Sequence, residues 1–377
     1  MIRTTITDSF AQVKDPRKQH APPHLLIDII TIALCAVIGG ANDWVAVEKF
    51  GRAKAGWLRQ FLRLPHGIPS HDTFGTVFAA IEPSEFEHGF IQWTQRVSQI
   101  SRGEIVPIDG KSVRRSHDRS EGQAALHLIS AWASQNQLIL GQLKVADKSN
   151  EITAIPKLLE LLDLTGAIVT IDAMGCQTEI AQQIVAQEAD YVLALKDNQG
   201  KLFREVRRLF HDARTEPASP IPYEQAQTVE KNHGRLETRR CLTINEPAYI
   251  AYLNPQGKWT NLQSIAMVEA QRRIGEEVTT ETRYYLSSLS GQAAHLNHVI
   301  RTHWQIENQV HWVLDVSFRE DDSRIRKGHG PQNFAFLRRM ALNLLKRDTS
   351  ESCGIQNKRL KAGWDDAYLA KILANLS

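Results

Sequence analysis

The sequence predicts a mixed α/β protein, with a helical N-terminal region ahead of a core in which strands and helices alternate. Three observations support this. Apolar residues recur at helical spacing over 1–99, short apolar runs typical of strands follow Gly103, and a proline-rich stretch over 206–292 interrupts them. The 377 residues suffice for two or three domains, and 42% hydrophobic and 23% charged residues exclude a disordered or collagen-like chain.

Residues 1–99 contain helix signals. Pro22-Pro23 precede an apolar helix that ends at Gly39-Gly40. Its apolar run, Leu25–Ile38, is 14 residues long and contains Asp28, whereas a bilayer span needs about 20. We therefore expect a buried helix. Further helices are expected over Trp44–Leu62, after a cap at Ser70 or Asp72, and from Pro83.

The core that follows has the order βββαβαβ. Turn-prone residues 134–136 join the second and third strands, so the first three strands should pair as a meander. We start the first helix near Thr153 because Pro156 is tolerated only in a first turn. This strand order is that of a ribonuclease-H-like fold. The expected strands are Glu104–Ile108, Ala124–Ala133, Gln137–Val145, Ala167–Ile171 and Tyr191–Leu195, and a second helix is expected about Gln177–Gln187.

Prolines and glycines over 206–292 separate short β-rich runs and indicate a mainly β insertion in this core. Helical patterns return over Ala293–Val316 and Pro331–Lys346, and the last thirty residues are a tail or a short helical appendage. The expected β runs are Tyr249–Leu253, Ser264–Glu269 and Glu281–Leu286. The chain thus divides into a helical N-terminal domain (1–99), a core (100–205 and 293–348), an insertion (206–292) and a C-terminal tail (349–377).

The overall charge is not informative about a partner. Lys+Arg 45 against Asp+Glu 42 gives a net charge of +3, too small to indicate a polyanion without local clustering. The four cysteines have neither a disulfide framework nor metal-type spacing, and no signal peptide is evident, so we expect a cytoplasmic protein.

Three carboxylates are placed where they could form one site. Asp109 and Asp172 end the first and fourth predicted strands, and Glu307 lies on the helix after the insertion. Open α/β sheets place sites at the carboxyl ends of their strands, and that helix could pack across those ends. Mg²⁺ binds carboxylate and phosphate oxygens, and two such ions can activate the attacking oxygen and stabilise the leaving one in phosphoryl transfer.

At these residues the chain resembles the DDE-type insertion-sequence transposases of the H-repeat-associated group. The resemblance covers nearly the whole chain, and its N-terminal part belongs to a helical domain that precedes the catalytic one in that family. The matching segments are PSHDTFGTVFAAIEP at 69–83, PIDGKSVRRS at 107–116, KSNEITAIP at 148–156, TIDAMGCQTEIA at 170–181, DYVLALKDNQ at 190–199 and HWQIENQVHWVLDVSFRED at 303–321.

The resemblance implies a transposase with a ribonuclease-H-like catalytic core, a β insertion and a helical N-terminal domain for DNA ends or a partner subunit. It implies that Asp109, Asp172 and Glu307 are catalytic and bind two Mg²⁺ ions, for which Mn²⁺ can substitute. The enzyme would cleave the element's terminal inverted repeats and join the 3′-OH to target DNA, as a homodimer or higher oligomer on double-stranded DNA. Such a protein would associate with the bacterial nucleoid when bound.

The chain departs from a signature of related transposases, Tyr-x2-Arg-x3-Glu-x6-Lys. The corresponding positions hold Ile300, His303, Glu307 and Leu314, so the Arg and Lys are absent. His303 and His311 lie four residues on either side of Glu307 and could replace them. A hairpin intermediate is accordingly not implied.

Basic and polar residues near these positions are candidates for phosphate contact, because Lys and Arg gain from counterion release on DNA. Ordinary surface charge is the alternative for each of them. The candidate DNA-binding residues are Lys111, Arg114, Arg115, Lys196, Asn198, His303, His311, Arg324, Arg326 and Lys327.

Several other interpretations stay open at this point. The spacing His303-x3-Glu307-x3-His311 also fits a zinc or iron site. The segment around Ser70–Ile81 fits either a helix-turn-helix or core packing. Lys148, Asn150 and Glu151 match a family segment, but helix capping explains them adequately. The whole chain could also be a DNA-binding remnant or a plain metal-dependent nuclease.

Overall fold

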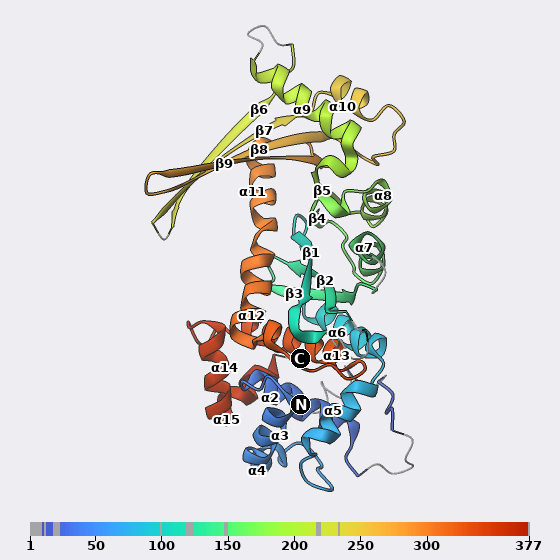
Figure 1. The fold of residues 1–377 in the computed structure, drawn as a ribbon, viewed down its shortest axis with the longest axis vertical. Helices are drawn as coiled ribbons and strands as arrows, with labels where there is room; N and C mark the ends of the chain where they lie inside the picture. The colour runs from blue at the N-terminus through green and yellow to red at the C-terminus, as the bar shows by residue number, and fades with distance from the viewer. Residues whose placement is uncertain are drawn as a thin grey trace.

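The computed structural model describes residues 10, 13–17, 23–98, 100–117, 122, 124–146, 150–215, 220–232 and 234–375. Its centre is one nine-stranded sheet with the order β3-β2-β1-β4-β5-β9-β8-β7-β6. Figure 1 shows an elongated molecule, with β6–β9 towards one end and the N-terminal helices at the other. The predicted mixed α/β class is confirmed. Within the described part, no helix is both long and apolar enough to cross a membrane.

The first five strands form the half of the sheet that carries the candidate aspartates. β1 pairs antiparallel with β2, and β2 with β3, as the predicted meander requires. β4 pairs in parallel with β1 and with β5. The strands are β1 Ile105–Val113, β2 Leu126–Ala133, β3 Leu138–Lys144, β4 Ile168–Ile171 and β5 Asp190–Leu195.

β1 is longer than the sequence predicts. We expected it to end at Ile108, but it continues to Val113 because β2 pairs with it from Ile108 to Val113, whereas β4 stops at Ile171. Asp109 therefore lies within a strand, at the point where β1 loses its parallel neighbour. The prediction that Asp109 ends its strand is wrong in this detail.

Helices cover both faces of this half-sheet (Figure 1). α11 (Ala293–His303) covers one face, where Ile105 and Val192 pack with Val299. α7 (Glu151–Glu160) and α8 (Thr178–Ala186) cover the other. Successive side chains of a strand point to opposite faces. Asp109 therefore shares the α11 face with Ile105, and Gly110 is on the α7 face.

The first core helix begins earlier than predicted. α7 starts at Glu151 rather than near Thr153, so Pro156 lies inside the helix, beyond its first turn. The burial of Ile155, Leu158 and Leu159 against the sheet outweighs the backbone hydrogen bond that proline cannot donate.

The segment after β5 adds four antiparallel strands to the same sheet. β9 pairs with β5, and β8, β7 and β6 follow outwards. α9 crosses the boundary expected at 206, and Tyr249–Leu253 is helical in α10 rather than a strand, with Pro247 in its first turn. The elements are α9 Gly200–Thr215, β6 Glu224–Asn232, β7 Arg235–Ile244, α10 Pro247–Leu253, β8 Ser264–Ile274 and β9 Glu277–Ser287.

The N-terminal helices largely follow the sequence signals. The apolar helix is α2, and Ser70 caps α5 by accepting a hydrogen bond from the backbone N–H of Thr73. The helix expected over Trp44–Leu62 is instead two short helices that meet at Lys54. The bounds are α2 Leu26–Ile38, α3 Trp44–Ala53, α4 Ala55–Leu58, α5 His71–Ala80 and α6 Pro83–Val97.

Helix α13 (Gly330–Arg347) joins the N-terminal helices to the sheet. The Asn333 amide donates to the carbonyls of Phe78 and Ile81, at 2.8 and 2.9 Å. Asn343 exchanges two 2.9 Å hydrogen bonds with the backbone of Ile139 in β3. Because these contacts are buried, the N-terminal helices and the sheet share one core.

The last part of the chain is helical, which was one of its two expected forms. α14 (Ile355–Trp364) and α15 (Asp366–Ala374) follow α13. The buried Arg359 guanidinium donates to the carbonyls of Val37 and Ala41 at the end of α2, at 2.8 and 3.2 Å. The C-terminal helices are therefore packed on the N-terminal ones.

Candidate active site

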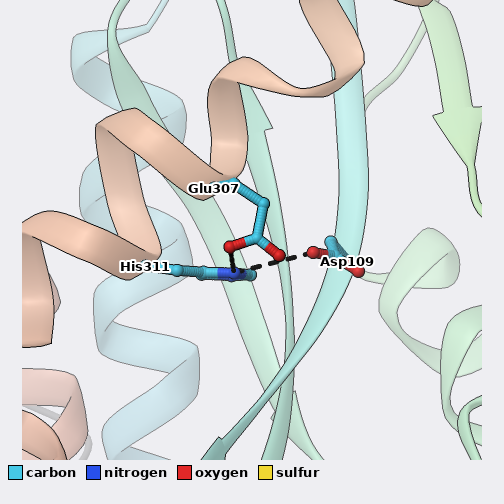
Figure 2. A group of neighbouring side chains, drawn as sticks. All are labelled: Asp109, Glu307 and His311. Atoms are coloured by element: carbon cyan, nitrogen blue, oxygen red, sulfur yellow. Dashed lines mark ion pairs between the residues drawn. The ribbon is translucent and has the colours of Figure 1, made fainter. Parts of the chain in front are cut away.

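Asp109, Glu307 and His311 come together at the α11 face of the sheet (Figure 2). The His311 Nδ1 lies 3.6 Å from Asp109 Oδ2 and 3.4 Å from Glu307 Oε2. One ligand atom from each residue lies within 4.8 Å of the others. This is close enough for one metal ion to contact all three, since such bonds measure about 2.0–2.6 Å.

Glu307 and His311 are positioned by an irregular turn. The predicted helix Ala293–Val316 is interrupted at Trp304, and Glu307–His311 forms a π-turn, η4, before α12 (Trp312–Phe318). The backbone N–H of Trp312 donates to the carbonyl of Glu307. Single π-turns are frequent at functional sites. Here the turn directs Glu307 and His311 together towards β1.

The charges in this group interact strongly. The pKa of Asp109 is raised to about 6, mainly by burial; His311 opposes the rise, and the nearby Glu307 carboxylate adds to it. The hydrogen bond from His311 lowers the pKa of Glu307. Two facing carboxylates with one imidazole between them are a suitable ligand set for a divalent cation.

Asp172 lies next to Asp109 but outside the closest group. It follows Ile171, whose register partner on β1 is Ile108. Its Oδ1 accepts a hydrogen bond of 3.0 Å from the backbone N–H of Met174. Burial raises its pKa, the charge of Glu151 adds to the rise, and Lys196 opposes it. A cavity of about 180 Å³ lies beside it, lined among others by Asp172, Lys196 and Trp304.

Glu151 is a residue of this region that the sequence did not identify as functional. Its Oε1 lies 2.7 Å from the Nε2 of His127 on β2. The predicted capping role does not hold, because Asn150 is the N-cap and makes no side-chain capping bond, and the Glu151 side chain reaches the sheet instead. The KSNEITAIP match was the signal that could have found it.

Lys111 does not fit the predicted phosphate contact. Only 7% of its side chain is exposed, and its Nζ lies 2.7 Å from Asp315 and 3.1 Å from Asp321. Arg114 and Arg115 lie at the surface and pair with Asp321 and Asp322, at 3.1 and 3.2 Å. These ion pairs connect the end of β1 to the 3-10 turn η5 (Glu320–Asp322).

The two histidines have different surroundings. His303 Nδ1 is 2.8 Å from the Thr170 hydroxyl, and burial lowers its pKa to about 4. It is therefore neutral at pH 7, which argues against the expected phosphate contact. It is also absent from the Asp109–Glu307–His311 group, so the zinc or iron site with both histidines is not assembled. His311 is buried between the carboxylates rather than facing outward.

Lys196 and Asn198 leave β5 beside Asp172, as their order in the sequence predicts. The Asn198 amide donates to the carbonyl of Ala173, at 2.6 Å. Asn198 therefore holds the loop that follows Asp172. Lys196 is exposed and faces the cavity beside that aspartate.

Arg324, Arg326 and Lys327 lie in a separate groove of about 1140 Å³ between the N-terminal helices and the segment after η5. Its other wall includes Asn42 from the α2–α3 connection and His71 of α5. Gly328 permits this contact: its φ is +50°, and a Cβ there would stand 2.5 Å from the carbonyl oxygen of Ala79. The groove thus joins two regions far apart in the sequence.

The protein therefore has a mixed α/β fold and a candidate metal site formed by Asp109, Glu307 and His311. The family model "Transposase DDE domain" matches residues 100–344, and the model "DDE_Tnp_1-associated" matches residues 7–94. The chain therefore belongs to the DDE transposase family, which confirms the resemblance. Membership of this family implies dependence on a divalent metal.

Curated relatives agree with this assignment. The protein named "Putative transposase YncI" of Escherichia coli O157:H7 is 39% identical, over 99% of this chain and 95% of its own length. "H repeat-associated putative transposase YhhI" of E. coli K12 is 37% identical, over 96% of each chain. Among solved structures, a piggyBac transposase synaptic complex with hairpin DNA is similar with a TM-score of 0.44 and 9% identity, over 99% of this chain and 77% of that one.

Proposed function

We propose that this chain is an active transposase that cleaves the ends of an insertion sequence and joins the freed 3′-OH to target DNA. The observation that supports this most directly is the approach of Asp109 and Glu307, which lie far apart in the sequence, to within ligand distance of one another. A decayed copy would be under no constraint to keep that approach.

The proposed metal ligands are Asp109, Asp172 and Glu307, with His311 beside them. When bound, two Mg²⁺ or Mn²⁺ ions would activate the attacking oxygen and stabilise the leaving oxygen of the phosphodiester. Asp109 must be deprotonated to bind, and His311 favours that form. Asn198 holds the loop that carries Asp172.

In this proposal the strands β1–β5 with α11–α13 are a ribonuclease-H-like catalytic core, and β6–β9 belong to an insertion within it. The groove at Arg324, Arg326 and Lys327 would hold the DNA backbone, because it combines three cations with a wall from the N-terminal domain. Two element ends must be held together, so at least a dimer would form on DNA in the cytoplasm, at the nucleoid.

The test is a strand-cleavage and joining assay on DNA that carries the element's own terminal repeats, with Mg²⁺ or Mn²⁺. We expect cleavage at the element ends and joined products. Asp109→Asn and Glu307→Gln should abolish both. Glu179→Gln, at an exposed carboxylate in the first turn of α8, is the matched control and should retain activity.

Two outcomes would contradict the proposal. Full activity of Asp109→Asn would remove the metal assignment. Nicking without joining, on any DNA, would indicate a plain nuclease instead.

A further inference from the structure

Helix α9 (Gly200–Thr215) carries a row of positive charge that belongs neither to the candidate site nor to the groove at Arg324. Its sixteen residues contain five Lys and Arg side chains against two acidic ones, whereas the net charge of the whole chain is only +3. This is the local clustering that the overall charge does not reveal. The exposed cationic side chains of α9 are Lys201, Arg204, Arg207, Arg208, His211 and Arg214.

The helix brings most of these side chains to one side. Residues at i, i+3, i+4 and i+7 share one side of a helix. The buried residues of α9 lie on the other side, where the Phe210 ring packs 6.1 Å from the ring of Tyr284 on β9. α9 is therefore an amphipathic helix whose outer side is cationic. The four residues with this spacing are Arg204, Arg207, Arg208 and His211.

The cationic side of α9 borders a cavity of about 560 Å³ beside β8 and β9. Four arginines and His211 of α9 line it, and its described lining contains no carboxylate. The groove at Arg324 differs in this respect, because three aspartates are part of its lining. An anion that enters the α9 cavity would therefore meet cations without a competing carboxylate.

Several of these cations are not neutralised by the described part of the chain. The side chains of Arg204, Arg207 and His211 make neither an ion pair nor a hydrogen bond with a described residue. Arg208 and Arg214, in contrast, each lie within 3.5 Å of a glutamate oxygen. Arg204 and Arg207 can thus pair with an external anion without first breaking an ion pair to a described residue.

A solvated helix surface explains less of this arrangement. Like charges three and four positions apart destabilise a helix, and cations near its N-terminus oppose the helix dipole. Lys201 and Arg204 lie near that end, and the first turn contains no acidic residue. A sequence that weakens its own helix in this way is expected where the charges serve a bound partner.

The length of the row indicates a polyanion rather than a small ligand. Arg204 and Arg214 are separated by about 15 Å along the helix axis, at about 1.5 Å per residue. One strand of a DNA duplex carries a phosphate about every 3.4 Å of axis, so about four phosphates lie along this length. A single phosphate group could contact only part of the row.

The row begins beside the candidate site. Phe203 of α9 and Tyr284, whose rings are 5.6 Å apart, both line the cavity next to Asp172, and Tyr284 also lines the α9 cavity. Figure 1 places α9 beside β6–β9, and α5, which lines the groove at Arg324, towards the opposite end of the molecule. β1 and α12 lie between them, so the two basic surfaces lie on different sides of the candidate site.

We propose that the exposed cations of α9 hold the target duplex, the second DNA molecule of the joining step, by its phosphates. Phosphate contacts carry no sequence information, which suits a DNA whose sequence is not fixed. With the element end in the groove at Arg324, the target would reach the candidate site from the side of α9. This inference rests on the proposed function, because only strand joining requires a second DNA.

The first test measures DNA binding without metal. A fluorescent duplex of unrelated sequence is titrated with the purified full-length chain at several salt concentrations. Arg204→Ala/Arg207→Ala should reduce the slope of log K against log salt by about 2, because each lost phosphate contact releases about one counterion fewer. Arg204→Lys/Arg207→Lys should keep the slope. The matched control Arg96→Ala/Lys157→Ala, which removes two exposed cations from α6 and α7, should keep it as well.

The second test separates the target from DNA that flanks the element. Element ends that are already cut carry no flank, so their joining to an added duplex depends on the target alone. Arg204→Ala/Arg207→Ala should lose joining at limiting target, regain it at saturating target, and cleave flanked ends at an unchanged rate. A thermal melt controls for folding: this variant should melt no lower than the unchanged chain, because repulsion between like charges is removed.

The outcomes separate the two proposals. If the alanine variant keeps its salt slope and its joining at limiting target while Asp109→Asn abolishes cleavage, α9 does not hold the target and the transposase proposal stands. Slower cleavage of flanked ends with normal joining of cut ends would assign α9 to the flank and overturn the inference. If Asp109→Asn cleaves and joins normally, the proposed metal site is wrong, whereas the salt slope still reports on α9.

Discussion

Glu87 lies inside α6 with 6% of its surface exposed, and its Oε1 has no hydrogen-bond partner among the described residues. Burial raises its pKa from 4.5 to about 8. The folded chain therefore holds this proton over a pH range in which the unfolded chain has released it. Stability from this group is present at low pH and is lost as the pH rises from about 4.5 to about 8.

We expect Glu87→Gln to remove this loss, which should be on the order of a few kcal/mol between pH 5 and pH 8. Urea unfolding at several pH values measures it. Glu160→Gln changes an exposed glutamate at the end of α7 and should keep the pH profile of the unchanged chain. An unchanged profile in Glu87→Gln would mean that Glu87 does not retain its proton.

At the level of single residues, the sequence predicts the carboxylates that lie at the ends of apolar runs. Asp109 is predicted in this way, and Glu307 from its place on the helix after the insertion; the structure brings the two together. The sequence alone does not show that Lys111 is buried. The three acidic residues around its side chain, Asp315, Glu320 and Asp321, come from a segment about two hundred positions later in the chain. The contact of Glu151 with His127 could not be predicted from the sequence, because only the folded sheet places His127 beside it.

Among the elements, β1 and the α12–η5 segment are joined by the ion pairs of Lys111. Removing the buried Lys111 charge leaves Asp315 without its ion-pair partner, whereas Asp321 keeps Arg114 and the fully buried Glu320 keeps Arg339. We expect Lys111→Met to lower the free energy of unfolding by about 3–5 kcal/mol. Denaturant titration measures this.

Arg114 supplies the control for Lys111, because it pairs with the same Asp321 while 82% of its side chain is exposed. Arg114→Ala should cost less than about 1 kcal/mol. Equal effects of the two substitutions would show that burial does not determine the contribution of Lys111.

Whether a segment is a helix or a strand could be predicted where its apolar residues recur regularly over many positions, as in α2, β2 and α13. The failures have physical reasons. The end of β1 depends on pairing with β2 after β4 has stopped. The run Tyr249–Leu253 is apolar enough for a strand, but Pro247 begins a helix there. The π-turn over Glu307–His311 interrupts the helix expected over Ala293–Val316, and no change in the apolar spacing of the sequence indicates it.

For the molecule as a whole, the groove between the N-terminal helices and the segment after η5 makes a prediction about DNA. Each of Arg324, Arg326 and Lys327 that contacts a phosphate releases a counterion. Substituting any one of them by alanine should weaken binding to unrelated DNA sequences uniformly and reduce the slope of log K against log salt by about 1. Fluorescence anisotropy at several salt concentrations measures the slope.

Lys157, an exposed lysine on α7, is the control for the groove. Lys157→Ala should leave the slope unchanged. If all three groove variants also leave it unchanged, the DNA backbone lies elsewhere on the molecule.

The four strands β6–β9 also affect any attempt to shorten the protein. β5 bonds to β4 along one side and, over Val192–Leu195, to β9 along the other. A chain reduced to 100–205 joined to 293–348 would leave that second side of β5 as an open edge, and open edges template association between copies. Such a shortened chain should elute from a size-exclusion column as aggregate rather than as monomer. By pairing with β5, β9 therefore also prevents association between copies through this strand edge.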